Sequence, residues 1–327
     1  MFKKDIFHIQ SQNQFETTAL AVFKHQFEHN TVYRSFCDLL YKHPSEIHAL
    51  EDIPFLPIDL FKSHKVICDS KATVPPIVFE SSGTTGTQVS KHYVTDIALY
   101  EHSFITNFEM HYGSVKDYAI LALLPSYLER GQSSLVYMVD HLIKKGAHPE
   151  SGFFLYDHFA LSEKLKMLEQ KGQKTLLIGV SYALLDFIES HPLQLEHTIV
   201  METGGMKGRR KEMIRAELHQ LLREGFGVDH IHSEYGMTEL LSQAYSKGEG
   251  IFKTPPWMKI LIRDPEDPFA LRTNSSSGGI NIIDLCNVNS CAFIATQDIG
   301  NQVKENEFSI LGRFDNSDVR GCNLLVV

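Results

Sequence analysis

The chain has 327 residues, of which 43% are apolar and 22% charged, an ordinary globular composition for one large domain or two smaller ones. Acidic residues outnumber basic ones by 40 to 31, giving a net charge of −9, and no Lys/Arg cluster forms a basic face, so we expect no nucleic-acid binding. No apolar run approaches the roughly 18 residues of a membrane span, and the N-terminus has no signal-peptide pattern. Five scattered cysteines argue against a disulfide framework and favour the reducing cytoplasm.

The first seventy residues are predicted to be helical. Apolar residues recur at three- and four-residue spacing in two stretches, first Phe15, Ala19, Val22, Phe23 and Phe27, then Val32, Phe36, Leu39 and Leu40. Two prolines within residues 53–57 end this pattern, because proline lacks an amide hydrogen and disfavours helix in its predecessor. We therefore expect a helical region packed on the core (residues 1–75), the core itself (76–315) and a short tail (316–327).

From residue 76 onward, short apolar runs alternate with helical segments. The predicted strands are 77–79, 118–124, 152–156, 175–180 and 198–201, and the predicted helices are about 95–112, 131–146, 158–171, 182–190 and 207–224. This alternation predicts an α/β fold, with a parallel or mixed sheet and helices on both faces. After residue 225 a smaller β-rich part is expected, with a hairpin loop at 272–279 and strands at 257–263, 279–285 and 292–296.

The most specific local motif is a loop rich in Ser, Thr and Gly, which follows an apolar strand and precedes a helix expected to begin near Thr95. Its residues are Ser81, Ser82, Gly83, Thr84, Thr85 and Gly86. Glycines permit a tight backbone and the hydroxyls add donors, so the loop is suited to wrap an anionic phosphate. It lacks the Gly-Lys-Ser/Thr of a P-loop, and a loop of this composition is often a plain connection.

Three more motifs follow. Residues 232–239 combine Tyr235, which suits base stacking, with Thr238, a phosphate donor, and Glu239, an oxygen ligand for Mg²⁺. Residues 295–300 place Asp298 on an expected turn, where it would accept two ribose hydroxyls, and residues 311–315 add the guanidinium of Arg313. Each has a structural alternative: a core tyrosine, an ordinary Asp turn and a surface turn.

In this order and spacing, the four motifs resemble the large N-terminal domain of the adenylate-forming superfamily, which includes acyl-CoA ligases, luciferase and nonribosomal adenylation domains. Further strings resemble the LuxE-type acyl-protein synthetases within it, namely residues 53–57 with 61–62, 123–131, 202–208 and 318–322. The resemblance implies the adenylate-forming α/β fold, with βαβ layers and a smaller β-rich part. The mobile C-terminal lid domain is expected to be absent, because only twelve residues follow Asp315.

The resemblance also implies ATP- and Mg²⁺-dependent activation of a fatty or other carboxylic acid to an acyl-adenylate. The implied nucleotide-binding residues are Ser81, Ser82, Gly83, Thr84, Thr85, Gly86, Lys91, Gly204, Gly205, Tyr235, Gly236, Asp298 and Arg313. Thr238 would donate to the α-phosphate and Glu239 would hold Mg²⁺. Lys207 is a candidate to replace the lysine of the missing lid, and it is equally suited to cap the helix that follows it. Residues 123–138 and 176–185 are expected to line the acyl pocket.

In the implied second step, the Cys322 thiolate, with Arg320 nearby, takes the acyl group and passes it to an acyl reductase, acyltransferase or carrier protein. The alternative for Cys322 is a small buried residue in a terminal strand. The other four cysteines are expected in the core, and three histidines at solvent-facing helix positions: His25, His29 and His219. Two other functions stay open, an acyl-CoA ligase of the phenylacetate type and a non-catalytic subunit that binds nucleotide or a partner.

Overall fold

The computed structural model describes residues 2–68, 76–82, 88–125, 131–205, 210, 213–272 and 277–314. The α-helices are α1 (Lys3–Phe7), α2 (Gln12–His29), α3 (Thr31–Leu39), α4 (Leu60–Ser63), α5 (Ile97–Tyr112), α6 (Ser134–Gly146), α7 (His158–Gln170), α8 (Ser181–Ser190) and α9 (Arg215–Phe226). Short 3-10 helices are η1 (Leu50–Asp52), η2 (Val115–Asp117) and η3 (Leu285–Asn289). The strands are β1 (Leu56–Pro57), β2 (Ile77–Glu80), β3 (Lys91–Val94), β4 (Ala119–Leu123), β5 (Gly152–Phe153), β6 (Thr175–Val180), β7 (Thr198–Thr203), β8 (His232–Tyr235), β9 (Ala244–Ser246), β10 (Ile251–Lys253), β11 (Met258–Arg263), β12 (Gly278–Asp284), β13 (Phe293–Lys304) and β14 (Glu307–Arg313).

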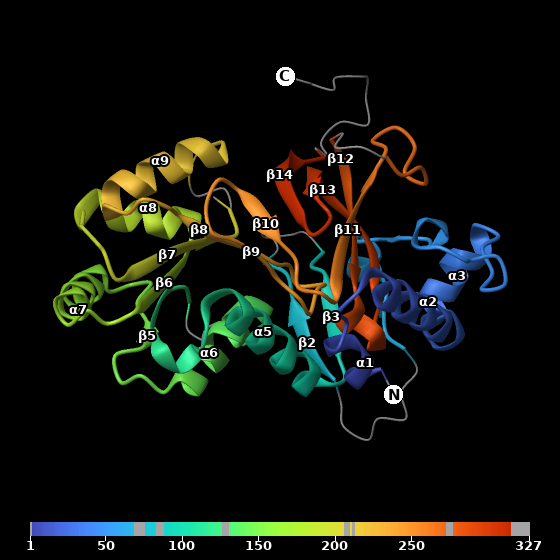
Figure 1. The fold of residues 1–327 in the computed structure, drawn as a ribbon, viewed down its shortest axis with the longest axis horizontal. Coiled ribbons are helices and arrows are strands. Elements are labelled where there is room, and N and C mark those ends of the chain that lie inside the picture. Colours follow the sequence, from blue (N-terminus) through green and yellow to red (C-terminus); the bar gives the residue numbers. More distant parts are fainter. Residues whose placement is uncertain are drawn as a thin grey trace.

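One mixed sheet runs through the described residues in the order β11-β12-β13-β14-β10-β9-β8-β7-β6-β4-β5, with β1 added beside β13. Strands β4 to β8 pair in parallel, whereas β8 to β14 pair antiparallel along this order. The predicted α/β fold is confirmed. The β-rich part is a continuation of the same sheet, as Figure 1 shows.

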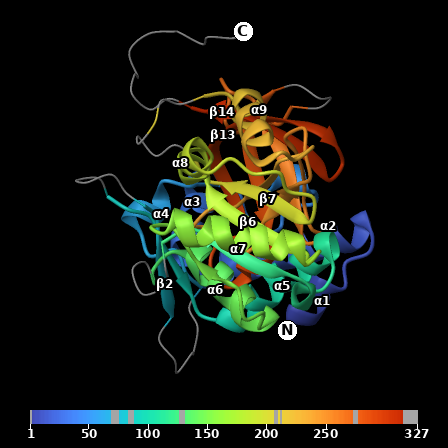
Figure 2. The same ribbon diagram turned by 90° about the vertical axis from the view of Figure 1, so that its left-hand side faces the viewer.

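Helices cover both faces of the parallel half of the sheet. Helices α8 and α9 lie above β6 and β7, while α5 and α6 lie below them (Figures 1 and 2). Strands β4 and β6 are consequently buried along their whole length. Parallel strands covered on both faces are continuous apolar runs, which is why residues 175–180 could be recognised from sequence with the bounds that the structure shows.

The N-terminal helices pack on the β-rich part. Helix α2 buries the predicted face, since Phe15, Ala19, Val22, Phe23 and Phe27 are all buried. The predicted face of α3 is only partly buried, with Val32 and Phe36 half-buried against the core. Leu39 is 78% exposed, and the buried residues of α3 are Tyr33 and Cys37. The Tyr33 hydroxyl donates to the Pro54 carbonyl at 2.7 Å, and this long-range contact sets the rotation of the helix.

A buried polar side chain, Gln26, fixes α2 to η3 and to the turn that follows it. The Gln26 amide donates to the carbonyls of Asn287 (2.8 Å) and Val288 (3.1 Å), and it accepts from the amide N–H of Ala292. All these groups are buried, so breaking one bond would leave an unpaired polar atom. Helix α2 therefore fixes residues 287–292, which also contact the candidate site.

Three predicted boundaries differ from the structure. Residues 152–156 form a strand only at Gly152–Phe153. The helix expected from residue 207 begins at Arg215, and Met213 and Ile214 before it are coil. Residues 292–296 belong to a strand that continues to Lys304. No helix of the described residues combines the length and the apolar character needed to cross a membrane.

Candidate functional site

The Ser/Thr/Gly-rich loop joins two antiparallel strands, β2 and β3. The helix expected near Thr95 begins at Ile97, but β3 lies between the loop and this helix. Strand β3 was missed because its sequence, Lys-His-Tyr-Val, carries little apolar signal. The base of the loop is closed by two hydrogen bonds, from Ser81 N to Ser90 O at 3.0 Å and from Ser90 N to Ser81 Oγ at 2.9 Å. Ser82 is exposed beside this base, and residues 83–86 lie outside the described residues.

Lys91, a predicted nucleotide-binding residue, lies on β3 directly across from Glu80 on β2. Its ammonium group is 3.2 Å from the Glu80 carboxylate, and its side chain is 46% exposed. A half-exposed ion pair of this kind contributes little to the free energy of folding, so an incoming phosphate can compete with Glu80 for Lys91.

Strand β3 connects the loop to the segment that contains Thr238 and Glu239. The Ser90 side chain lies near the Glu239 carboxylate and acts to lower its pKa. Two positions further on, His92 Nδ1 lies 2.8 Å from the Thr238 carbonyl oxygen. The Glu239 carbonyl accepts from Asn287 Nδ2 at 2.8 Å. Motifs that are about 150 residues apart in sequence are thus in direct contact.

His92 is the central side chain of this connection. It is fully buried, and its Nε2 atom lies 2.9 Å from Ser290 Oγ. A carbonyl oxygen only accepts, so Nδ1 carries the proton and Nε2 accepts from the Ser290 hydroxyl. Burial lowers the pKa of His92 to about 4, and the bond to Thr238 opposes this only in part. The ring is therefore neutral at physiological pH and acts as a fixed bridge.

Glu239 is buried, with 5% of its surface exposed, and burial raises the pKa of its carboxyl group. Ser90 and the positive charges of Arg313 and Lys62 act in the opposite direction. No group of three or more His, Cys, Asp or Glu residues suited to a metal ion occurs in the part of the chain that the structure describes. A single carboxylate fits Mg²⁺, which keeps several waters and binds substrate phosphates as well.

The two remaining motifs meet at Asp298. The Tyr235 hydroxyl donates to Asp298 Oδ2 at 2.7 Å, and Arg313 Nε lies 2.9 Å from Asp298 Oδ1. Asp298 was expected on a turn, but it lies inside strand β13, directly opposite Arg313 of β14. The turn prediction is wrong because β14 pairs with β13 through this position, with a register shift just after it, between Ile299 and Gly300.

Tyr235 is a buried residue that supports Asp298. Its ring contacts Phe252 and Phe308, and 8% of its surface is exposed. Burial, and then the Asp298 charge, raise its pKa well above the usual value for tyrosine, so the phenol keeps its proton and donates. A carboxylate accepts about four hydrogen bonds, so Asp298 has capacity for ribose hydroxyls beside Tyr235 and Arg313.

Gly236 follows Tyr235, and a larger residue at this position would clash with a neighbouring side chain. A Cβ atom at this position would lie 2.4 Å from Glu234 Oε1. Glu234 is buried, and the Thr203 hydroxyl donates to its Oε2 atom at 2.6 Å. Burial raises the pKa of Glu234 to about 7.

The chain after β7 is open. Gly204 has a φ of 69°, which favours glycine, and a Cβ atom on Gly205 would meet nothing within 4 Å. Among the described residues, Gly205 therefore leaves space against the backbone, next to Thr203 and Glu234. Lys207 lies outside the described residues, as do Arg320 and Cys322.

His219 was expected to face solvent, and this is wrong. It lies on α9 with 8% of its surface exposed, and its Nε2 atom is 3.5 Å from the Glu202 carboxylate of β7. Arg215 Nε lies 3.6 Å from the same carboxylate. Helix α9 packs over the end of β7, so the face that carries His219 points toward the sheet.

The predicted acyl-pocket segments line neither of the two cavities recorded in the described structure. The larger cavity, about 680 Å³, lies between the start of α2, α5, and strands β9 to β11, and the smaller, about 340 Å³, lies between α9 and β14. Neither includes a residue of 123–138 or 176–185, and residues 126–130 are outside the described ranges. The acyl pocket stays a prediction. The four cysteines Cys37, Cys68, Cys286 and Cys291 are buried, as expected.

Sequence reasoning missed the residues that hold the site together. Ser90 and His92 flank Lys91 but had no predicted role, and η3 with the turn after it contributes Asn287 and Ser290. Asp284 accepts from the amide N–H groups of Leu241 and Ser242. Nothing in the local spacing marks these residues, because their partners lie far away in sequence.

Solved structures with a similar fold are adenylate-forming ligases. ATP-bound MatB from Rhodopseudomonas palustris matches with a TM-score of 0.55 and 17% identity, over 72% of this chain and 47% of that one. An open conformation of 2-hydroxyisobutyryl-CoA ligase, in complex with 2-HIB-AMP and CoA, matches with a TM-score of 0.67 and 11% identity, over 93% of this chain and 70% of that one. This chain has the fold of the large N-terminal domain of adenylate-forming ligases, and it spans about half the length of MatB. The described residues do not include a separate lid domain.

The family comparison is more specific. The model for the family described as acyl-protein synthetase, LuxE, matches residues 5–107. This match confirms the predicted resemblance to LuxE-type acyl-protein synthetases. It includes the Ser/Thr/Gly-rich loop and Lys91, whereas Glu239, Asp298 and Cys322 lie beyond it. A sequence search among curated proteins finds no match.

Proposed function

We propose that this protein uses ATP to convert a carboxylic acid to an acyl-adenylate. The single observation that carries the proposal is the contact between the predicted motifs. Strand β3, which follows the loop, reaches the Thr238 carbonyl through His92, and Tyr235 reaches Arg313 through Asp298. These contacts support one shared site, in which the loop would bind phosphate, the buried Glu239 would hold Mg²⁺ and Asp298 would bind the ribose.

In the proposed first step, an oxygen of the substrate carboxylate attacks the α-phosphorus of ATP, and pyrophosphate leaves. Both reactants are anions, so catalysis depends on positioning and on neutralising charge. Loop 81–86 and Lys91 hold the β- and γ-phosphates, and Thr238 donates to the α-phosphate. Asp298 orients the ribose, and the adenine lies against Gly204 and Gly205. A Mg²⁺ ion on Glu239 would supply positive charge to the phosphate oxygens.

In the proposed second step, the Cys322 thiolate attacks the acyl carbonyl, and AMP leaves with the bridging oxygen to give a thioester. The acyl group then passes to a partner, such as an acyl reductase, acyltransferase or carrier protein. Burial supports the choice of Cys322 over other thiols. It raises the pKa of Cys37 to about 12 and raises those of Cys286 and Cys291 well above the usual value, so these thiols stay protonated.

Coenzyme A is the second candidate acceptor. The observation in its favour is the match to 2-hydroxyisobutyryl-CoA ligase over 93% of this chain, in a structure that contains CoA. In this alternative the acid is activated in the same way, and the CoA thiol replaces Cys322 in the second step.

The two acceptors are distinguished by one assay. The full chain is incubated with Mg²⁺, ATP and radiolabelled acids of several chain lengths, with and without CoA. Pyrophosphate release reports adenylation, and hydroxylamine-sensitive label on the protein reports a thioester. We expect label on the wild-type protein and none on Cys322→Ser, with pyrophosphate release retained in both.

Cys37→Ala is the matched control and should keep the label, because the Cys37 thiol is buried and protonated. Acyl-CoA formation without labelled protein would replace Cys322 by CoA as the acceptor. An absence of pyrophosphate release with every acid would refute adenylation itself.

A further inference from the structure

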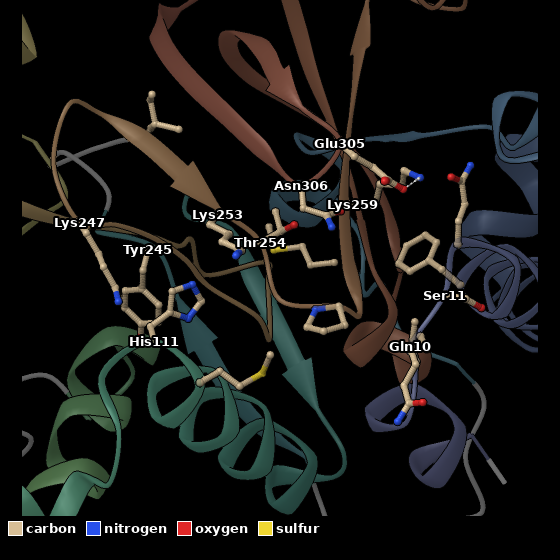
Figure 3. A pocket seen from close by; sticks show the side chains of 17 residues that line it. Gln10, Ser11, His111, Tyr245, Lys247, Lys253, Thr254, Lys259, Glu305 and Asn306 are labelled. Carbon is tan, nitrogen blue, oxygen red and sulfur yellow. Dashed lines mark ion pairs between the residues drawn. The ribbon is translucent and has the colours of Figure 1, made fainter.

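The larger cavity, about 680 Å³, lies between the N-terminal helices and the antiparallel half of the sheet (Figure 3). Its walls come from the α1–α2 junction, the C-terminal end of α5, and strands β9 to β11, and the β13–β14 turn closes it. Its volume falls within the roughly 300–1,000 Å³ of ordinary small-molecule sites. The proposed function uses none of the residues that line it.

This cavity is remote from the nucleotide site. Asp298 and Arg313 face each other toward one end of the β13–β14 hairpin, and Lys304 pairs with Glu307 at the other. The cavity is lined by Glu305 and Asn306 at the tip of the hairpin. Six residues of strand separate Asp298 from Lys304, which corresponds to about 20 Å.

The cavity is positively charged on a protein whose net charge is −9. Lys247, Lys253 and Lys259 line it, and Glu305 is the single acidic residue among the described residues of its lining. Glu305 lies 3.7 Å from Lys259. Among the described residues, Lys247 and Lys253 have no carboxylate within 4 Å, and the Lys247 ammonium lies over the Tyr112 ring.

Glu307 is the nearest neighbour of Lys253 across the β10–β14 ladder, but it does not neutralise the lysine. The Glu307 carboxylate pairs with Lys304 at 3.4 Å. Lys247 and Lys253 therefore present two uncompensated charges to the same cavity. Point charges of this kind are suited to a phosphate or carboxylate group.

Two wall residues carry buried polar atoms that have no hydrogen-bond partner among the described residues, Thr254 Oγ1 and His111 Nε2. Thr254 is 4% exposed. His111 Nδ1 donates to the Asn107 carbonyl at 2.9 Å, so the free Nε2 atom is an acceptor. Burial, and then the charges of Lys247 and Lys253, lower the pKa of His111, which places both lysines near this ring. Buried polar atoms without partners are rare in folded proteins, and a bound ligand or water would satisfy them.

We propose that this cavity binds a phosphomonoester whose organic part is apolar. The phosphate oxygens accept from Lys247, Lys253 and the Thr254 hydroxyl. A monoprotonated phosphate also carries an O–H group that can donate to His111 Nε2, which an ionised carboxylate lacks. The apolar part lies against the side chains of the remaining wall, which include Ile9, Phe15, Met110 and Met258.

The test measures binding of hexyl phosphate to the full chain by titration calorimetry at low salt. We expect Lys247→Gln and Lys253→Gln each to weaken binding at least fivefold. Lys166→Gln on α7 is the matched control for the loss of one charge, because Lys166 is exposed and pairs with Glu163 far from the cavity. The control should bind within twofold of the wild type.

Thr254→Val separates binding from folding. Its hydroxyl makes no hydrogen bond in the described structure, so the urea midpoint should stay equal or rise, while binding of hexyl phosphate weakens. Hexanoate should bind more weakly than hexyl phosphate. The proposal is overturned if the wild type does not bind hexyl phosphate, if the control loses as much affinity as the two lysine variants, or if hexanoate binds equally well.

Discussion

Replacing His92 by asparagine removes one end of the bridge between β3 and the turn that follows η3. Asparagine places an amide nitrogen where His92 has Nδ1, so the bond to the Thr238 carbonyl is retained. Nothing replaces Nε2, so the buried Ser290 hydroxyl loses its acceptor at 2.9 Å and keeps only the longer bond of 3.4 Å to the Asn287 carbonyl. We expect this change to lower the free energy of unfolding by about 1–3 kcal/mol at pH 7.

The pH dependence of this effect gives the sharper prediction. Burial lowers the pKa of His92 to about 4, below the value of 6.5 that describes an exposed histidine. Between these values the unfolded chain binds the proton and the folded protein does not. Stability from this residue is therefore present above pH 6.5 and is lost as the pH falls. From pH 7 to pH 5 the wild type should lose about 2 kcal/mol through His92.

His92→Asn lacks this titration, so the stability difference between the two proteins should shrink by the same amount at pH 5. Urea unfolding at both pH values, followed by fluorescence of the single tryptophan, measures it directly. Trp257 is 2% exposed and changes environment on unfolding. His48→Asn, at an exposed histidine, should unfold like the wild type at both pH values. An equal loss of stability in His92→Asn and wild type would refute the assignment of a neutral, buried bridge.

Three further predictions concern the same region. Glu239→Gln and Asp298→Ala should each lower ATP–pyrophosphate exchange tenfold or more, about 1.4 kcal/mol in the barrier; unchanged exchange in both would remove their proposed roles. Glu234 has a pKa raised to about 7 by burial, so its contribution to stability falls as the pH rises from 4.5 to 7, by up to about 3 kcal/mol. Glu234→Gln should flatten that slope in urea midpoints measured between pH 5 and 8, and an unchanged slope would contradict the assignment. Gly300→Ala should cost about 1–3 kcal/mol in urea unfolding, because the new Cβ would lie 2.3 Å from the Ser309 carbonyl oxygen, and a stable variant would show that the β13–β14 ladder can shift.

The sequence determined those features that depend on neighbours a few positions away. The spacing of Phe15, Val22 and Phe27 predicted the buried face of α2, and an unbroken apolar run predicted β6 with correct ends. The order and spacing of the motifs predicted the fold class that the solved structures confirm. Periodicity is a local property of the chain, so it can be read from the sequence without knowing which surface the helix or strand packs against.

The tertiary structure decided which face, register and polar partner each residue takes. α3 turns toward Tyr33 because its hydroxyl meets Pro54, and Asp298 lies in a strand because β14 pairs with it. His92 meets Ser290 at a separation of 198 positions. Its ring is neutral because the packed protein excludes water from it. Contacts and desolvation of this kind arise only when distant segments come together, so no local pattern in the sequence encodes them.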